Sequence, residues 1–203
     1  MPDGVRADSA PFRAVHLGKH PGLWLALAAA LALKLVVLLT GHVTFNSDEA
    51  IMSLMARHIL RGEHAVFYWG QAYMGTLHSY LMAPVFVLLG ETVVTSRLVP
   101  LAVHLAVVAT TYALAWRVGQ DRFGATAAAL LVALPPVMVT LYTTVSIGAW
   151  VEILLLNNLI WLIGWSILSG RRQATGWWAL TGFLAGVGWW ELPIIVTSAA
   201  PLA

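Results

Sequence analysis

Two adjacent carboxylates, Asp48 and Glu49, are the residues of this chain best suited to chemistry. They lie in a polar stretch from Thr44 to Gly75, between long apolar segments. A carboxylate at a membrane surface is partly desolvated, and desolvation raises its basicity toward that of a general base. Acidic residues in a first helical turn also stabilise the helix dipole, by about 0.3–1 kcal/mol each. Taken alone, the local pattern therefore favours a purely structural role for both residues.

A cluster of aromatic and amide side chains continues the same stretch. It comprises Phe67, Tyr68, Trp69, Gln71 and Tyr73. Such side chains suit stacking on, and hydrogen bonding to, a sugar or a lipid headgroup. Aromatic rings also gather at membrane interfaces without any ligand, and this cluster taken by itself favours that interfacial role.

The composition is that of an integral membrane protein. The chain has 203 residues, of which 60% are hydrophobic and 10% charged, whereas a soluble domain carries about 25% charged residues. Cysteine is absent, which excludes disulfides, thiol chemistry and cysteine-ligated zinc. The basic residues are scattered between apolar segments, so we expect no nucleic-acid partner. His58 and His64 are too far apart in sequence to share one helical face, and we predict no metal site.

The elements that must position these residues are predicted to be transmembrane helices. Five segments are apolar over roughly the 20 residues that a bilayer crossing requires. They are residues 22–40, 97–117, 124–143, 148–168 and 176–200. We therefore expect an all-α fold, a polytopic bundle of about five spans. Residues 1–21 would be a cytoplasmic tail and residues 22–203 the membrane domain. Its long first outer loop, about residues 41–96, would contain short amphipathic helices at the membrane surface.

The distribution of basic residues favours five spans over six. The apolar segment 77–90 has 14 residues, which is short for a span, and we expect it to be interfacial or re-entrant. With five spans and a cytoplasmic N-terminus, seven Lys and Arg residues lie inside and three outside. Counting residues 77–90 as a sixth span leaves four inside and six outside.

A short amphipathic helix is predicted directly after the first span. Asn46 can cap a helix that begins at Ser47, and Glu49 at the third position would complete a capping box. Ile51, Met52, Met55 and Ile59 then form an apolar face, and Gly62 is a plausible terminator. We expect this helix to lie along the outer membrane surface.

Charged side chains within the predicted spans are further candidates, because charge inside a bilayer is costly. We expect Lys34 to extend to the outer headgroups, with attraction of a lipid phosphate as the alternative. Glu152 is expected near the wet outer surface. Glu191 either faces the bundle or lines a cavity for a lipid, and the pattern leaves both open.

Uncharged polar residues in the spans are expected to be structural. His104, Asn157 and Asn158 suit interhelical hydrogen bonds better than ligand binding. Pro135 and Pro136 are predicted to kink the third span.

Several motifs together resemble one family across nearly the whole chain. They are F-N-S-D-E-A, Y-W-G-Q-A-Y-M-G, L-M-A-P-V-F-V-L-L-G and S-R-L-V-P, followed by L-P-P, G-A-W-V-E and G-W-W. The chain thereby resembles the polytopic (GT-C type) glycosyltransferases that use polyprenyl-phosphate sugars. This class includes the protein O-mannosyltransferases and the lipid A aminoarabinose transferases. Family members usually have more spans, so the resemblance implies an N-terminal fragment, in a prokaryotic plasma membrane.

The resemblance implies an inverting sugar transfer at the outer membrane face. Asp48 would be the general base that deprotonates an acceptor, which then displaces polyprenyl phosphate. Glu49 would orient the acceptor or tune Asp48 through like-charge coupling. The implied substrate-binding residues are Lys34, Tyr68, Gln71, Tyr73 and Glu191. The donor is the lipid-linked sugar itself, no cofactor is implied, and the acceptor is a protein, lipid or glycan.

Two other functions remain open at this stage. A transporter or flippase fragment for a lipid-linked substrate would depend on membrane-embedded groups such as Lys34 and Glu191 rather than on Asp48. An inactive, truncated assembly subunit would tolerate Asp48→Asn, whereas changes on its Ile51/Met55/Ile59 face would disrupt the complex.

Overall fold

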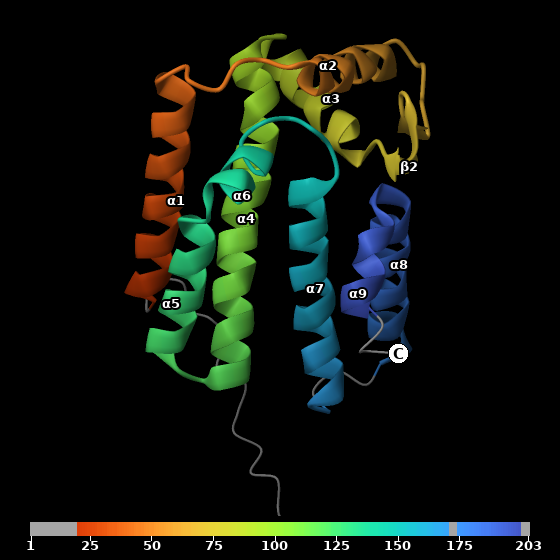
Figure 1. The fold of residues 1–203 in the computed structure, drawn as a ribbon. Helices are drawn as coiled ribbons and strands as arrows, with labels where there is room; N and C mark the ends of the chain where they lie inside the picture. Colours follow the sequence, from red (N-terminus) through yellow and green to blue (C-terminus); the bar gives the residue numbers. More distant parts are fainter. Residues whose placement is uncertain (1–19, 171–173, 200–203) are drawn as a thin grey trace, which may run out of the picture.

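The computed structural model describes residues 20–170 and 174–199, which form a helical bundle with a cap of short elements across one end (Figure 1). The upright helices are α1 (Pro21–Leu39), α4 (Val93–Gly119), α5 (Arg122–Ala133), α7 (Trp150–Leu168) and α8 (Thr175–Glu191). Helix α2 (Ser47–Leu60) and helix α3 (Leu77–Leu89) lie across one end of these helices, beside the two-stranded hairpin of β1 (Phe67–Tyr68) and β2 (Gln71–Gly75). The predicted all-α class is confirmed.

Three of these helices are long and apolar enough to cross a membrane: α1, α4 and α7. They match the predicted spans 22–40, 97–117 and 148–168 within a few residues. The chain therefore has the character of an integral membrane protein. Helix α3 has 13 residues, fewer than a span needs. The cytoplasmic tail predicted for residues 1–21 lies almost entirely outside the described residues.

The third predicted span, residues 124–143, is divided, and the expectation of a mere kink is wrong. Helix α5 ends at Ala133, and the short helix α6 (Val137–Tyr142) begins after Pro136. Proline lacks the N–H that a helix interior needs and disfavours helical backbone in the preceding residue. Two consecutive prolines therefore end α5 rather than bend it.

The last predicted span, residues 176–200, is also interrupted. Helix α8 ends at Glu191, Leu192 is extended, and a 3-10 turn, η2 (Pro193–Ile195), leads into α9 (Val196–Ala199). Pro193 again explains the interruption, since the residue before a proline avoids helical backbone. Residue 200 lies outside the described part.

Stripes of small residues allow α1 and α5 to approach closely. Ala26 and Ala30 of α1 and Ala125, Ala129 and Ala133 of α5 recur at four-residue spacing and are all buried in one cluster. Small side chains at this spacing let helix backbones pack closely in a membrane, where water does not drive helix association.

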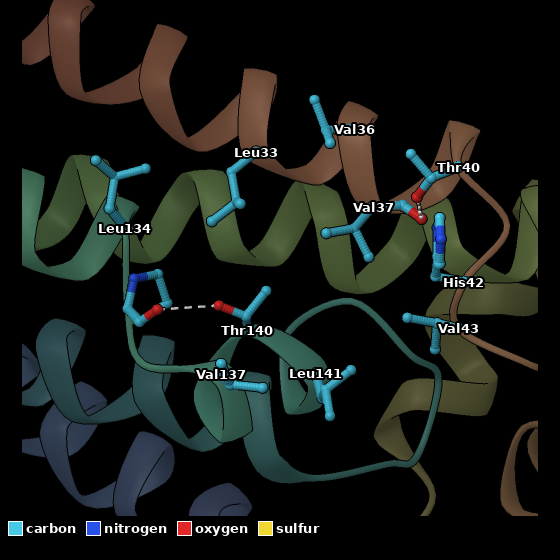
Figure 2. Close-up of a pocket in the computed structure, with 11 residues that line it drawn as sticks. Leu33, Val36, Val37, Thr40, His42, Val43, Leu134, Val137, Thr140 and Leu141 are labelled. Atoms are coloured by element: carbon cyan, nitrogen blue, oxygen red, sulfur yellow. Dashed lines mark hydrogen bonds between the residues drawn. The ribbon is translucent and has the colours of Figure 1, made fainter.

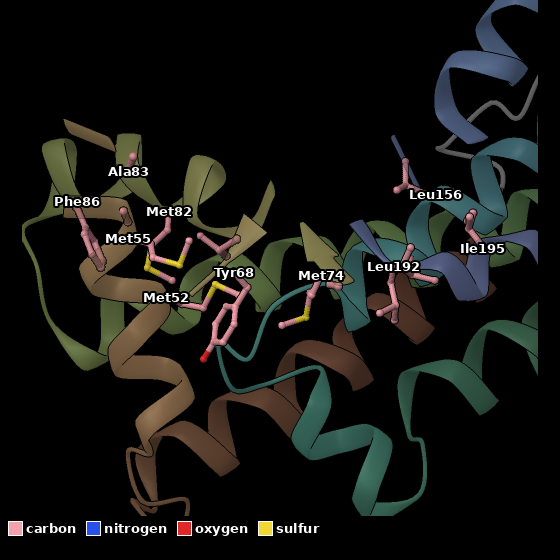
Figure 3. Close-up of a cluster of buried hydrophobic side chains, with 14 of the residues drawn as sticks. Met52, Met55, Tyr68, Met74, Met82, Ala83, Phe86, Leu156, Leu192 and Ile195 are labelled. Carbon is pink, nitrogen blue, oxygen red and sulfur yellow. The ribbon is translucent and has the colours of Figure 1, made fainter. Parts of the chain in front are cut away.

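The cap packs on the bundle through a methionine-rich cluster (Figure 3). Met52 and Met55 of α2 and Met82 of α3 are fully buried in it, together with Met74 of β2. Helix α2 thus packs its apolar face on α3. Its boundaries are as predicted: the Asn46 side chain accepts a hydrogen bond from the Glu49 N–H, and Gly62, with φ +85°, follows its C-terminus.

Candidate functional site

A cavity of about 200 Å³ lies at the capped end of the bundle, between the cap and the helix ends next to it. Four of the predicted site residues line this cavity: Asp48, Tyr68, Gln71 and Tyr73. The other lining residues are Met74, Tyr142, Ile147, Trp150 and Leu192. Five separate stretches of the chain therefore contribute, and the acidic and aromatic parts of the Thr44–Gly75 stretch meet in one place.

Local structure brings the two parts together. Asp48 is in the first turn of α2, directly after the Asn46 cap, so its side chain is at the helix N-terminus. The hairpin returns the chain to this point through a turn at Gly70, whose φ of +89° glycine adopts without strain. Gln71 and Tyr73 are two residues apart on β2 and share a face, because strand side chains alternate.

Tyr68 connects the hairpin to the Asp48 carboxylate by a hydrogen bond. Its ring is 3% exposed, and its hydroxyl donates a hydrogen bond of 3.3 Å to Oδ1 of Asp48. Burial, together with the negative charge of Asp48 and this hydrogen bond, raises the pKa of Tyr68 above its usual range. The phenol therefore stays protonated and remains a donor to Asp48, which is itself exposed to the cavity and solvent.

Aromatic rings form the opposite wall. Tyr142 at the end of α6 and Trp150 at the start of α7 stack with their ring centroids 5.2 Å apart. Both rings are partly exposed, at 37% and 43%. A small cavity with one carboxylate, one amide and several aromatic faces suits a polyhydroxylated ligand such as a sugar ring.

Glu49 faces away from the cavity, into the protein. Nε and Nη2 of Arg97 each donate to one of its carboxylate oxygens at 2.8 Å, and the Ser146 N–H donates to Oε1 at 3.2 Å. The expected capping box does not form, because these bonds hold the Glu49 carboxylate away from the helix terminus. Glu49 is fully buried and does not line the cavity, so it is separated from the space to which Asp48 is exposed.

Lys34 is also buried, and the prediction that it extends to the headgroups is wrong. Its ammonium donates to the Thr140 carbonyl at 3.0 Å and to the hydroxyls of Thr143 and Thr144. These acceptors lie in and just after α6, which the proline break brings against α1. With three donors engaged, Lys34 has no N–H left for a substrate phosphate.

Glu191 faces the bundle interior and does not line the cavity. Its Oε2 accepts the Leu77 N–H at 3.1 Å, at the start of α3. Glu152, expected near the wet surface, is likewise buried, and its Oε1 is 2.6 Å from Nδ1 of His78. These groups join α3, α7 and α8 beneath the hairpin, so they support the cavity from below.

Arg97, Tyr142 and Trp150 are the residues whose contribution the sequence did not reveal. Arg97 is part of the S-R-L-V-P motif, but its partner is 48 positions earlier in the chain, and no local pattern reports that pairing. Within residues 20–170 and 174–199 there is no group of three or more His, Asp or Glu side chains that could hold a metal ion.

The comparisons with known proteins found nothing: no family model, curated protein or solved structure matches this chain.

Proposed function

We propose that this chain is a membrane glycosyltransferase that moves a sugar from a polyprenyl-phosphate donor to an acceptor at the outer membrane face. The observation that carries the proposal is the cavity in which Asp48 meets Tyr68, Gln71 and Tyr73. These are residues that the motif resemblance assigned to catalysis and sugar binding. In this proposal the bundle has five spans, with α5 and α8 as its shorter members and the N-terminus in the cytoplasm.

A mainly apolar groove beside the cavity supports a lipid-linked donor (Figure 2). This groove, which we call the α1/α6 groove, has a volume of about 410 Å³. Its walls are mainly apolar: Leu33, Val36 and Val37 of α1 face Leu134, Val137 and Leu141. An isoprenoid chain fits such a lining, since it is apolar throughout.

The groove and the cavity adjoin along the chain. Leu141 lines the groove, and its neighbour Tyr142 lines the cavity. His42 and Val43 line the outer end of the groove, a few residues before Asp48. A donor with its chain in the groove would have its phosphate at this outer end and its sugar in the cavity. His42 is exposed there and can donate a hydrogen bond to the phosphate.

The proposed reaction is a single displacement at the anomeric carbon. Asp48 accepts the proton of the acceptor hydroxyl or amine as the acceptor atom forms its bond to that carbon. The bond from the anomeric carbon to the phosphate oxygen breaks, and polyprenyl phosphate leaves with the electron pair. Attack opposite the leaving group inverts the configuration. Tyr68 keeps the Asp48 carboxylate oriented, and Gln71 and Tyr73 bind the sugar hydroxyls.

The test is transfer of radiolabelled sugar from a polyprenyl-phosphate hexose, in membranes that contain the full chain and supply acceptors. We expect Asp48→Asn to lower the rate by about 10²–10⁴-fold, the usual contribution of a general base. Glu63→Gln is the matched control, because Glu63 is an exposed carboxylate of the same loop outside the cavity. Transfer at the wild-type rate by Asp48→Asn would overturn the proposal.

The transporter alternative is less well supported. It required Lys34 and Glu191 to reach the substrate, yet both are fully buried and bound to protein groups.

A further inference from the structure

A second cavity lies beside the break in the third predicted span, on another side of this break from the α1/α6 groove. This cavity, which we call the α4/α7 cavity, has a volume of about 400 Å³. Its walls come from α4, α5, α6 and α7. Pro135, in the break itself, lines both the groove and this cavity. The cavity therefore lies beside the break between α5 and α6.

Two of the residues that line the α4/α7 cavity have buried polar atoms without a partner. His104 is 1% exposed, and neither of its ring nitrogens has a hydrogen-bond partner among the described residues, 20–170 and 174–199. Oδ1 of Asn157 is buried and unpaired in the same part of the chain. The neighbouring Asn158, unlike Asn157, is paired through its side-chain amide, which donates to the hydroxyls of Thr110 and Thr111. Polar groups left unpaired at membrane depth are costly, so a partner from outside the chain is expected there.

The position of the cavity restricts what that partner can be. His104 lies within α4 and Asn157 within α7, both away from the helix ends, so a charged ligand would have to leave its water. Leu131 and Val139 of the lining are 76% and 39% exposed on the side of the bundle. In a bilayer this side faces lipid, so the ligand enters from the hydrocarbon.

We propose that the α4/α7 cavity binds a lipid that carries an uncharged hydroxyl group, such as a long-chain alcohol. An uncharged imidazole offers one N–H donor, and the Asn157 Oδ1 offers an acceptor. One hydroxyl satisfies both, because it donates to Asn157 and accepts from His104. Its hydrocarbon chain contacts Leu131, Leu154 and Trp161 and leaves toward the bilayer. This site does not depend on sugar transfer.

The test is photolabelling of the purified full chain in lipid nanodiscs. The probe is a long straight-chain alcohol with a diazirine on its chain, and its matched probe is the methyl ether, which cannot donate. We expect the alcohol to label the walls of the cavity on α5 and α7, mapped by mass spectrometry, in preference to the ether. His104→Phe and Asn157→Leu should each weaken labelling by about fivefold to tenfold, the effect of one lost hydrogen bond. His64→Phe, at an exposed histidine of the outer loop, is the control and should label as the wild type does.

Two results would overturn this inference. Equal labelling by the alcohol and the ether in the wild-type chain would assign the polar atoms to trapped water or to a partner helix. Labelling that maps away from the cavity walls, or that persists unchanged in Asn157→Leu, would exclude the site. The comparison of the two probes needs no variant, so it decides the question even if His104→Phe does not fold.

Discussion

Arg97 at the start of α4 binds both carboxylate oxygens of Glu49 in α2, each at 2.8 Å, in the interior of the protein. The same guanidinium donates from Nη1 to the Val43 carbonyl at 3.0 Å. Arg97 therefore fixes the connection between α1 and α2 as well as α2 itself. Because Asp48 adjoins Glu49, this ion pair fixes the position of the candidate general base without contacting the cavity.

We predict that Arg97→Leu strongly destabilises the chain. Removing one partner of a buried ion pair leaves the other charge uncompensated, which costs about 3–5 kcal/mol. Glu49→Arg should be as damaging, and the exchange of both residues, Glu49→Arg with Arg97→Glu, should recover part of the loss. Thermal unfolding in detergent micelles measures these differences.

The exposed pair of Arg57 and Glu91 is the control for this prediction. Their side chains are 43% and 35% exposed, and solvent screens such a pair. Arg57→Leu should leave the unfolding temperature nearly unchanged. Equal losses in Arg57→Leu and Arg97→Leu would show that burial of the Glu49–Arg97 pair has no special energetic role.

Local patterns were sufficient to predict most of the helices and much of the site. Hydropathy located α1, α4 and α7, and the Asn46 cap with Gly62 located both ends of α2. The cavity could be anticipated because its key residues lie in one stretch of about thirty positions, which a hairpin folds back on itself.

The environments of Lys34 and Glu49 were mispredicted because they depend on contacts distant in sequence. Lys34 is buried because its ammonium donates hydrogen bonds to threonines more than 100 positions later in the chain. These threonines lie close to α1 because the prolines divide the third span. Glu49 matched a capping box in its local sequence, but Arg97 is the stronger partner, since a bidentate charged bond exceeds a bond to a neutral N–H. Neither the contacts of Lys34 nor the preference of Glu49 for Arg97 can be read from the sequence around these residues.

A second prediction concerns Tyr68 and alkaline pH. The pKa of Tyr68 in the folded chain lies above its usual value, mainly because of burial and secondarily because of Asp48. A raised folded pKa contributes stability that is fully present below the unfolded pKa of about 10 and is lost as pH rises through the folded value. The stability of the wild type relative to Tyr68→Phe should be constant below pH about 10 and fall above it. A relative stability of the wild type that rises with alkaline pH would contradict the assigned cause.

A third prediction concerns the buried contact between His78 and Glu152. Each side chain is at most 2% exposed, and Glu152→Leu would leave Nδ1 of His78 without its partner. We expect a loss of about 1–3 kcal/mol, the cost of one unsatisfied buried polar group. The double variant, with His78→Leu added, should be more stable than Glu152→Leu, because removing both partners leaves no unpaired polar atom of this contact. Denaturant unfolding in mixed micelles measures this; a double variant less stable than either single one would contradict the assignment.

The last prediction concerns Gly75, where the hairpin contacts the end of α8. A methyl group at this position would lie 2.5 Å from Oε2 of Glu191 and 2.9 Å from the Glu191 Cα. The backbone atom cannot move aside as a flexible side chain would, so Gly75→Ala must push β2 away from α8, at a typical cost of about 1–3 kcal/mol.

Gly119→Ala is the matched control, because no heavy atom lies within 4 Å of its added methyl and it ends a helix. It should leave stability unchanged or slightly raised. If the chain has the sugar transfer proposed above, Gly75→Ala should lower it more than it lowers the amount of folded protein in the membrane, since β2 carries Gln71 and Tyr73. If both variants transfer sugar at the same rate per folded molecule, the packing of the hairpin on α8 does not position the cavity.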